Sequence, residues 1–324
     1  MNRVFVTRQI PKEALETLKS KCFLEIYESD EAIPRNILLE RVRDLDGLLC
    51  LLSENIDKEL IDRAPNLKVI SNLAVGFDNI DIEYATRKKI VVTNTPGVLT
   101  DATADFTWAL LLATARRIME GDRMCRILKF KGWGPMVLLG HDIVGKTLGI
   151  LGAGRIGTAV VERSWGWRME ILYYDKEIKT YLEEKFNARR VNMNELLENS
   201  DFISIHLPLS DETKCLIDEE ALRIMKETAI LINTARGPIV NESALLNALQ
   251  QKWIAGAGLD VFEQEPEITT GLTELDNVVL TPHIGSATIA TRNKMATMAA
   301  DNLLAVLEGK KPNFPVNPEV LNLK

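Results

Sequence analysis

The sequence predicts an α/β protein built from two doubly wound parallel-sheet domains. Short β-branched strands alternate with amphipathic helical stretches along nearly the whole chain. That alternation is typical of parallel sheets covered by helices on both faces. A length of 324 residues exceeds what one hydrophobic core usually supports. A break at Thr95-Pro96-Gly97 separates the two alternating series.

The first series begins at the amino terminus. Its buried strands are expected at Arg3–Arg8, Phe23–Tyr27, Gly47–Leu52, Leu67–Asn72 and Ile90–Asn94. Amphipathic patterns predict helices between them at Lys12–Ser20, Arg35–Arg43 and Lys58–Arg63. Together these elements predict one parallel sheet with its helices.

The second series opens with a long helix over Asp101–Arg117, with Thr100 or Asp101 as its N-cap. Its apolar part, Phe106–Ala115, is about half of the roughly 20 residues that a membrane span needs, so a buried helix is expected. The strands of this series are expected at Thr147–Leu151, Glu170–Tyr174, Phe202–His206, Ala229–Asn233, Gly256–Asp260 and Val278–Thr281. Ser286–Leu307 then predicts one long helix that returns to pack on the first domain.

Composition narrows the class of protein. The hydrophobic share of 46% and charged share of 26% are ordinary for a folded cytoplasmic protein. A net charge of −7 argues against nucleic-acid partners and against an anionic membrane surface. Charge interrupts the start of the chain before a secretory signal can form. The cysteines Cys22, Cys50, Cys125 and Cys215 are scattered, so neither a disulfide framework nor a metal site is expected.

A glycine-rich turn follows the strand Thr147–Leu151, with the pattern G-x-G-x-x-G. Gly152 permits the tight turn, and Gly154 lets backbone amides approach a pyrophosphate. Gly157 allows the next helix to pack closely on the strand. The amino end of that helix then directs free N–H groups at phosphates. The turn therefore predicts a dinucleotide-binding Rossmann domain.

The strand Glu170–Tyr174 ends in Asp175, about where a ribose-binding acid belongs. An alternative is an ordinary strand–helix turn with a solvated Asp at the strand end. Lys176 and Lys179 follow, and either could reach the 2′-phosphate of NADP. Because the carboxylate would sit at the ribose itself and repel that phosphate, NAD(H) is favoured over NADP(H).

Three polar residues follow strands of the second series: Arg236, Glu265 and His283. Ligands of open parallel sheets bind beyond the carboxyl ends of the strands, so these residues could converge on one crevice. Reduction of a 2-keto acid needs a hydride donor, a proton donor and a cation for the carboxylate. A guanidinium binds carboxylate bidentately, and histidine has a reference pKa of about 6.5, near working pH. Taken singly, each residue has an alternative interpretation. Arg236 could bind only the cofactor phosphate, Glu265 could be an ordinary loop carboxylate, and His283 could lie beside the start of the helix at Ser286.

Taken together, the motifs resemble the D-isomer-specific 2-hydroxyacid dehydrogenase family. They are Gly152–Gly157 with Asp175, His206-Leu207-Pro208-Leu209, Asn233-Thr234-Ala235-Arg236-Gly237, Leu259–Pro266, Thr281–Ser286, Asn72–Asp81 and Pro315-Val316-Asn317-Pro318. The resemblance implies a flavodoxin-like substrate domain, residues 1–99 plus 286–324. A Rossmann NAD(P)-binding domain, residues 100–285, is inserted in it.

The resemblance also implies roles. Arg236 would bind substrate, His283 would be the acid/base and Glu265 its partner. Substrate contacts would include Leu52, Val75 and Gly76 besides Arg236 and His283, with Ser53 nearby. The cofactor would be surrounded by Thr103, Gly152, Ala153, Gly154, Arg155, Ile156, Gly157, Asp175, Leu207, Pro208, Thr213, Thr234, Ala235, Arg236, Asp260 and His283. Family members are usually homodimers, with contacts through the helix near Asp101 and through Trp133–Gly140.

Within the family, Leu51–Asp57 and Ala74–Asn79 look most like glyoxylate/hydroxypyruvate reductases. Phosphoglycerate dehydrogenase and 2-ketogluconate reductase are the alternatives among enzymes. From another class, an NADH-sensing corepressor-like interaction protein would share the fold, because fold alone does not fix function. One departure is Arg168, which stands where the family commonly has Gly and puts the geometry of that turn in doubt.

Overall fold

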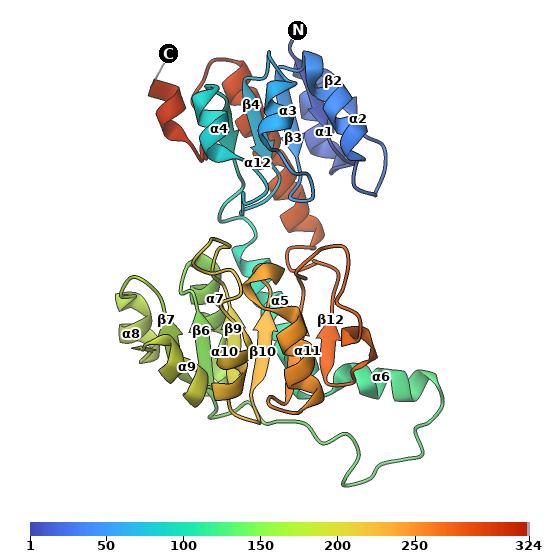
Figure 1. The fold of residues 1–324 in the computed structure, drawn as a ribbon, viewed down its shortest axis with the longest axis vertical. Coiled ribbons are helices and arrows are strands. Elements are labelled where there is room, and N and C mark those ends of the chain that lie inside the picture. Colours follow the sequence, from blue (N-terminus) through green and yellow to red (C-terminus); the bar gives the residue numbers. More distant parts are fainter. Residues whose placement is uncertain (323–324) are drawn as a thin grey trace. The chain divides into compact units, whose positions relative to one another are not determined.

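The computed structural model describes residues 1–322 and divides into two compact units (Figure 1). Unit 1 comprises residues 1–99 and 287–324, and unit 2 comprises residues 100–286. Ser286 therefore falls in unit 2, one residue beyond the boundary expected from the sequence. Both units are α/β with parallel sheets, as the sequence predicts.

Unit 1 contains a sheet of five strands. In spatial order they are β2 (Phe23–Ile26), β1 (Arg3–Val6), β3 (Gly47–Cys50), β4 (Val69–Asn72) and β5 (Val91–Thr93). Every neighbouring pair is parallel. This order is that of a flavodoxin-like fold, which confirms the prediction for the first domain.

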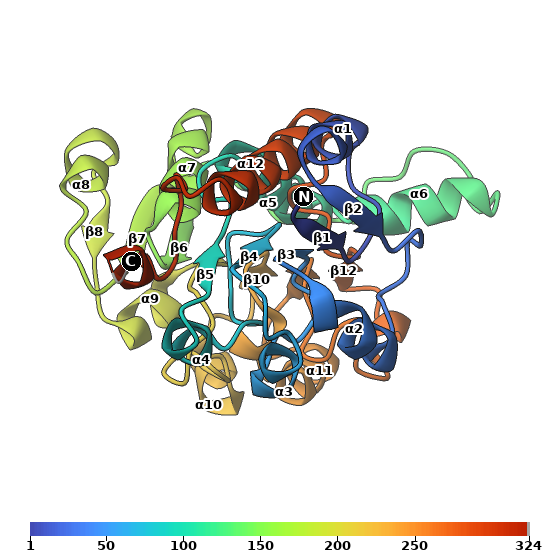
Figure 2. The same ribbon diagram turned by 90° about the horizontal axis from the view of Figure 1, so that it is seen from above.

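Helices cover both faces of the unit 1 sheet (Figure 2). On one face lie α1 (Lys12–Lys21) and α12 (Ile289–Leu307), and on the other α2 (Arg35–Arg41), α3 (Lys58–Asp62) and α4 (Ile82–Arg87). The short 3-10 helices are η1 (Val42–Asp44) and η5 (Pro318–Asn322). The predicted return of α12 to the first domain is confirmed, because it packs on α1, β3 and β4.

The start of α12 differs from the prediction of Ser286. The hydroxyl of Thr288 accepts a hydrogen bond from the Thr291 amide at 3.1 Å, so Thr288 is the N-cap and the helix begins at Ile289. A threonine at this position satisfies one of the amides that a helix start leaves unpaired.

Unit 2 contains a sheet of seven parallel strands. In spatial order they are β12 (Val278–Leu280), β11 (Gly256–Leu259), β10 (Ile230–Asn233), β9 (Phe202–Ile205), β6 (Thr147–Leu151), β7 (Glu170–Tyr174) and β8 (Arg189–Arg190). The order reverses at β6, as in a doubly wound dinucleotide-binding sheet. The prediction missed β8, because two exposed arginines carry no strand pattern.

Two helical layers also enclose the unit 2 sheet. The helices α5 (Thr100–Ala115) and α7 (Arg155–Arg163) bury one face, and α9 (Met193–Asn199), α10 (Glu219–Ile224) and α11 (Glu242–Gln250) bury the other. The remaining elements are α6 (Ile118–Arg126), α8 (Thr180–Phe186), η2 (Trp165–Trp167), η3 (Gly237–Ile239) and η4 (Leu272–Glu274). Helix α5 is buried along much of its length, as predicted.

Arg168 keeps the turn that glycine usually forms at this point. It ends η2 with φ of 51° and ψ of 42°, in the left-handed region that disfavours side chains. Its amide donates to the Trp165 carbonyl at 3.2 Å, and the Trp167 ring stacks on Trp108 at 6.0 Å between centroids. The turn is therefore present despite the departure from the family pattern.

Within residues 1–322, no helix combines the length and the apolar character that crossing a membrane requires. The cytoplasmic location and the absence of nucleic-acid partners stay predictions from composition and charge.

Candidate active site

The glycine-rich turn joins β6 to α7 as the motif requires. Gly152 has φ of 94°, and a β-carbon on it would lie 2.9 Å from the His206 carbonyl oxygen. A β-carbon on Gly157 would lie 2.2 Å from the Gly152 oxygen, whereas one on Gly154 would meet nothing within 4 Å. Gly154 is also the N-cap of α7 without a side-chain cap. The turn thus leaves open space in front of unpaired helix amides, which fits the pyrophosphate of a dinucleotide.

The Asp175 carboxylate lies against this turn. Its Oδ2 accepts a hydrogen bond from the Ala153 amide at 2.9 Å, and Oδ1 accepts one from the Glu177 amide at 3.0 Å. The ammonium of Lys179 is 3.3 Å from Oδ1, and the Asp175 side chain is 16% exposed. An acid that follows β7 and is held beside the phosphate-binding turn is suited to bind the hydroxyls of an adenosine ribose.

His283 and Glu265 form a hydrogen-bonded pair. Nδ1 of His283 lies 2.9 Å from Oε2 of Glu265, and Oε1 of Glu265 accepts from the Phe262 amide at 3.1 Å. Burial works against the charged form of Glu265. The hydrogen bond and charge of His283 outweigh it, with help from the Arg236 charge, so the pKa of Glu265 is lowered. Glu265 is therefore held as a carboxylate next to the imidazole.

Arg236 follows β10, the neighbour of the strand that precedes Glu265. Its Nη1 donates to the Ala235 carbonyl at 2.8 Å. The next residue, Gly237, packs so tightly that a β-carbon would lie 1.8 Å from the Phe262 carbonyl oxygen. Only glycine permits that approach, which brings the loop after β10 against the loop after β11.

Asp260 anchors the loop that carries His283. It is 1% exposed, and its carboxylate accepts hydrogen bonds from Thr281 Oγ1 at 2.7 Å, the Ile284 amide at 2.8 Å and the Gly285 amide at 2.7 Å. Burial raises the pKa of Asp260, against the hydrogen bonds and the His283 charge that lower it. His283 itself has φ of 54°, so the loop is held in a left-handed conformation that costs energy.

The sequence of this chain matches a known family of enzymes. A model of the D-isomer specific 2-hydroxyacid dehydrogenase, NAD binding domain, matches residues 108–285. The glyoxylate reductase of Thermococcus kodakarensis is 50% identical over 326 aligned residues, covering 99% of this chain and 98% of its own. The chain belongs to the D-isomer-specific 2-hydroxyacid dehydrogenase family.

Two solved structures are similar over nearly their whole length. A protein from Thermus thermophilus has a TM-score of 0.90 and 46% identity, covering 97% of this chain and 99% of its own. An NADPH-dependent glyoxylate/hydroxypyruvate reductase from Sinorhizobium meliloti, solved with NADP and malonate, has a TM-score of 0.84 and 31% identity, covering 97% and 96%. The dehydrogenase is thus a nicotinamide-dependent oxidoreductase of the glyoxylate reductase branch.

The other residues expected at the cofactor lie at the same sheet edge of unit 2. Thr234 follows β10, and its hydroxyl lies 2.9 Å from that of Thr107. Thr103 is buried in the first turn of α5, and its methyl would lie 3.6 Å from a β-carbon on Gly285. Thr213 donates to the Pro208 carbonyl at 2.7 Å, which closes the loop after β9. Arg155 and Ile156 open α7, Leu207 follows β9 and Ala235 follows β10.

Two polar residues that the sequence analysis did not assign lie on β9 and directly after it. Ser204 is buried, and its hydroxyl lies 2.8 Å from His206 Nε2. Desolvation lowers the pKa of His206 to about 3, so its imidazole is neutral. The His206 backbone also faces Gly152. The signal in the sequence is the alternation of polar residues in an otherwise apolar buried strand.

The expected substrate contacts of unit 1 also follow strands. Leu52 is partly buried after β3. The Val75 carbonyl accepts from Asn94 Nδ2 at 2.7 Å, and the Gly76 carbonyl accepts from Asn72 Nδ2 at 2.9 Å. These side-chain hydrogen bonds fix the segment after β4.

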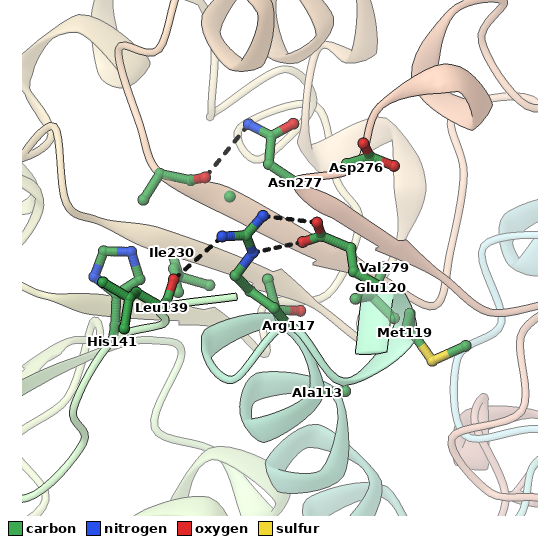
Figure 3. A pocket seen from close by; sticks show the side chains of 13 residues that line it. Ala113, Arg117, Met119, Glu120, Leu139, His141, Ile230, Asp276, Asn277 and Val279 are labelled. Carbon is green, nitrogen blue, oxygen red and sulfur yellow. Dashed lines mark hydrogen bonds and ion pairs between the residues drawn. The ribbon is translucent and has the colours of Figure 1, made fainter. Parts of the chain in front are cut away.

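A cavity of about 210 Å³ lies at the opposite, amino-terminal edge of the unit 2 sheet (Figure 3). Arg117 crosses it and donates from Nε and Nη2 to the Glu120 carboxylate at 2.7 Å each. Its lining includes Ile230 and Gly256, the first residues of β10 and β11. The residues of the candidate active site follow the carboxyl ends of these strands, so the cavity is not part of that site.

Proposed function

We propose that this dehydrogenase reduces glyoxylate, and also hydroxypyruvate, to the corresponding 2-hydroxy acid. The hydrogen-bonded pair of His283 and Glu265 at 2.9 Å carries the proposal, because it provides an oriented proton donor. The glyoxylate reductase relatives support the choice of substrate. They do not favour phosphoglycerate dehydrogenase, 2-ketogluconate reductase or a corepressor-like protein.

We assign distinct roles to His283, Glu265 and Arg236. The bound nicotinamide cofactor supplies the hydride. His283 donates a proton to the forming alkoxide from Nε2, since Nδ1 is paired with Glu265. Glu265 fixes the orientation and the tautomer of the ring by holding Nδ1. Arg236 binds the substrate carboxylate and polarises the neighbouring carbonyl through its planar guanidinium.

A turnover panel tests the proposed activity. Purified protein is assayed with glyoxylate, hydroxypyruvate, phosphohydroxypyruvate, 2-ketogluconate and pyruvate, each with NADH and NADPH. We expect the highest kcat/KM with glyoxylate or hydroxypyruvate. Preferred turnover of any other member of the panel contradicts the proposed substrate.

In the same assay Arg236→Lys should raise KM strongly, because the point charge of lysine does not replace the bidentate guanidinium of arginine.

We further propose that NADH is preferred over NADPH. The Asp175 carboxylate is fixed by the Ala153 amide at the phosphate-binding turn, where it would repel a 2′-phosphate. The two lysines that could attract the phosphate have acidic partners. Lys179 lies 3.3 Å from Asp175, and Lys176 donates to Glu212 at 2.6 Å. The NADP-bound relative from Sinorhizobium meliloti is the reason to test this directly.

The test compares kcat/KM for both cofactors at fixed ionic strength, because salt screens the lysines. Asp175→Ser should narrow or reverse the ratio of the two kcat/KM values. Glu170→Ser, which removes an exposed acid at the opposite end of β7, is the control. A wild-type preference for NADPH would show that the lysines govern this part of the site.

The remaining sequence-derived roles are also part of the proposal. The cofactor contacts in unit 2 are those of the phosphate-binding turn and of the loops after β7, β9, β10, β11 and β12. The substrate contacts in unit 1 are Leu52, Val75 and Gly76. We expect substitution of Leu52 to weaken substrate binding without weakening NADH binding.

We also propose that the protein is a homodimer. Helix α6 has no buried residue, and the segment after it extends from unit 2 (Figure 1). Several of its apolar side chains are largely exposed, namely Leu128 at 89%, Trp133 at 88% and Met136 at 76%. An apolar patch of this kind marks an interaction surface, and a second copy of the chain is the occupant that the sequence resemblance implies.

A further inference from the structure

A buried acid lies at the carboxyl edge of the unit 1 sheet. Glu54 is 4% exposed and belongs to the turn that follows β3. Its Oε2 accepts hydrogen bonds from the Leu51 amide and the Thr7 hydroxyl, both at 2.7 Å, and Oε1 accepts one from the Ser53 hydroxyl at 2.6 Å. The carboxylate therefore ties the turn 51–54 to the end of β1.

Arg8 is the cation beside this acid. Its Nη2 lies 3.7 Å from Oε1 of Glu54 and donates to the Ser53 hydroxyl at 3.1 Å. Its Nε is buried with no hydrogen-bond acceptor within residues 1–322. Burying an unpaired donor costs about 1–3 kcal/mol. The charge of Glu54 and the hydrogen bond to Ser53 offset this cost. A buried carboxylate in turn requires such a countercharge.

Asn79 holds the other side of the same turn. Its Nδ2 donates to the carbonyls of Leu51 and Glu54 at 3.0 Å each. The turn is thus fixed both by the Glu54 carboxylate and by the hydrogen bonds from Asn79 to its backbone carbonyls. It carries Leu52, which is partly buried and is one of the proposed substrate contacts.

We propose that Glu54 and Arg8 are positioning residues that hold the turn 51–54 in the conformation that contacts the 2-keto acid. This inference rests on the proposed function, since it takes Leu52 as a substrate contact. Neither residue is assigned a contact with the reacting atoms. A turn that is already ordered in the free protein binds substrate without a further entropy cost, so the pair lowers KM more than it affects kcat.

The experiment compares Arg8→Met, Glu54→Gln and the double variant. Arg8→Met leaves the buried Glu54 carboxylate without its cation, and Glu54→Gln leaves the half-buried Arg8 guanidinium without its anion. In both single variants KM for glyoxylate should rise about tenfold, with kcat and NADH affinity nearly unchanged. In the double variant, the glutamine can accept from Leu51 and Thr7 and donate to Ser53. The double variant should therefore recover most of the wild-type KM, which is a coupling that a general loss of packing does not produce.

Hydrogen exchange of the peptide 48–56 gives a readout that does not depend on activity. Exchange should be faster in both single variants and close to wild type in the double variant. Arg3→Met is the matched control: Arg3 begins β1 at the opposite edge of the sheet and pairs with Glu25 at 3.3 Å. It should leave both KM and this exchange unchanged. Thr7→Val removes only one hydrogen bond to Glu54, and serves if a charge variant does not fold.

The outcomes separate this inference from the proposed function. Faster exchange with an unchanged KM overturns the link between the turn and substrate. Unchanged exchange in Arg8→Met and Glu54→Gln overturns the positioning role itself. A wild type that reduces neither glyoxylate nor hydroxypyruvate overturns the proposed function, and with it the substrate part of the inference, while the exchange data still judge the anchoring of the turn.

Discussion

At the scale of single residues, the chemistry is concentrated in pairs whose members are distant in the sequence. Glu265 and His283 are 2.9 Å apart but lie on loops after different strands. The structure adds a reason for their geometry, because Asp260 holds the His283 loop through three hydrogen bonds from within the sheet edge. Orientation of the imidazole thus depends on residues that need not touch the substrate.

The proton-donor role predicts that His283→Ala lowers kcat by about 10²–10⁴-fold, the range for loss of a general acid. NADH affinity should be nearly unchanged, because the phosphate-binding turn is intact. Steady-state kinetics and NADH titration by fluorescence measure the two effects. His141→Ala is the control, since His141 lies at the cavity on the opposite sheet edge. Near-normal kcat in His283→Ala would remove His283 from the mechanism.

His206 predicts a pH dependence of stability. Its pKa is lowered to about 3 in the folded state, against a reference of about 6.5 when unfolded. Below pH ~6.5 the unfolded chain therefore takes up a proton that the folded chain does not, and stability falls as the pH drops toward 3, by up to about 1.4 kcal/mol per pH unit. Above pH ~6.5 this contribution is fully present.

Urea unfolding of wild type and His206→Asn between pH 7.5 and 4.5 isolates this effect, because all other titrating groups are common to both. The variant should lose less stability on acidification than the wild type. His141→Asn, which removes a histidine at the opposite sheet edge, is the matched control. Parallel profiles of wild type and His206→Asn would show that His206 is not kept neutral by folding.

At the scale of elements, the β6–α7 turn uses glycine in two ways, for close packing and for open space beside the backbone. Gly157 is needed for packing, since a β-carbon would lie 2.2 Å from the Gly152 oxygen, whereas Gly154 faces open space. The same motif therefore contains one position fixed by the fold and one available to a ligand.

Substitution of the two glycines should have opposite consequences. Gly157→Ala should lower the free energy of unfolding by about 1–3 kcal/mol through overpacking. Gly154→Ala should leave the melting temperature of the free protein nearly unchanged but weaken NADH binding, because its methyl group enters the space for the pyrophosphate. Thermal unfolding with and without NADH measures both. Equal NADH affinity in wild type and Gly154→Ala would place the pyrophosphate elsewhere.

At the scale of the whole molecule, the two units share one architectural rule. In each, a parallel sheet is enclosed by helices and the polar residues of interest follow the carboxyl ends of strands. The cavity of Figure 3 lies instead at the amino ends of strands of the unit 2 sheet, and there Arg117 and Glu120 pair with each other.

The exposed apolar segment after α6 predicts the assembly state. Light scattering after size-exclusion chromatography should give a mass near twice the 36.3 kDa of one chain. The double variant Leu128→Glu/Trp133→Glu should shift it toward the single-chain mass, because charges are costly in a buried interface. Trp165→Glu is the control, an exposed tryptophan outside this segment. A wild-type mass near 36.3 kDa would contradict the proposed dimer.

The sequence by itself determined the alternation of strands and helices and the position of the phosphate-binding turn with Asp175 after it, and it proposed Arg236, Glu265 and His283 as the reacting residues. Periodicity, glycine spacing and strand-end polar residues are local signals, so they can be found without coordinates. The same local reasoning missed β8 and placed the start of α12 too early, because a two-residue edge strand and a threonine N-cap leave weak patterns.

Only the tertiary structure decided which polar residues support one another. The contact between Ser204 and His206 joins neighbours on β9 and directly after it. In contrast, the hydrogen bonds between Thr7 and Glu54 and between Asp260 and Gly285 join segments far apart in the sequence. The close approach of Gly237 to the Phe262 carbonyl is another such contact. Hydrogen bonds and steric limits act over a few ångströms in space, whatever the separation along the chain. No motif could therefore show these contacts, although each contact shapes a loop on which the predicted chemistry depends.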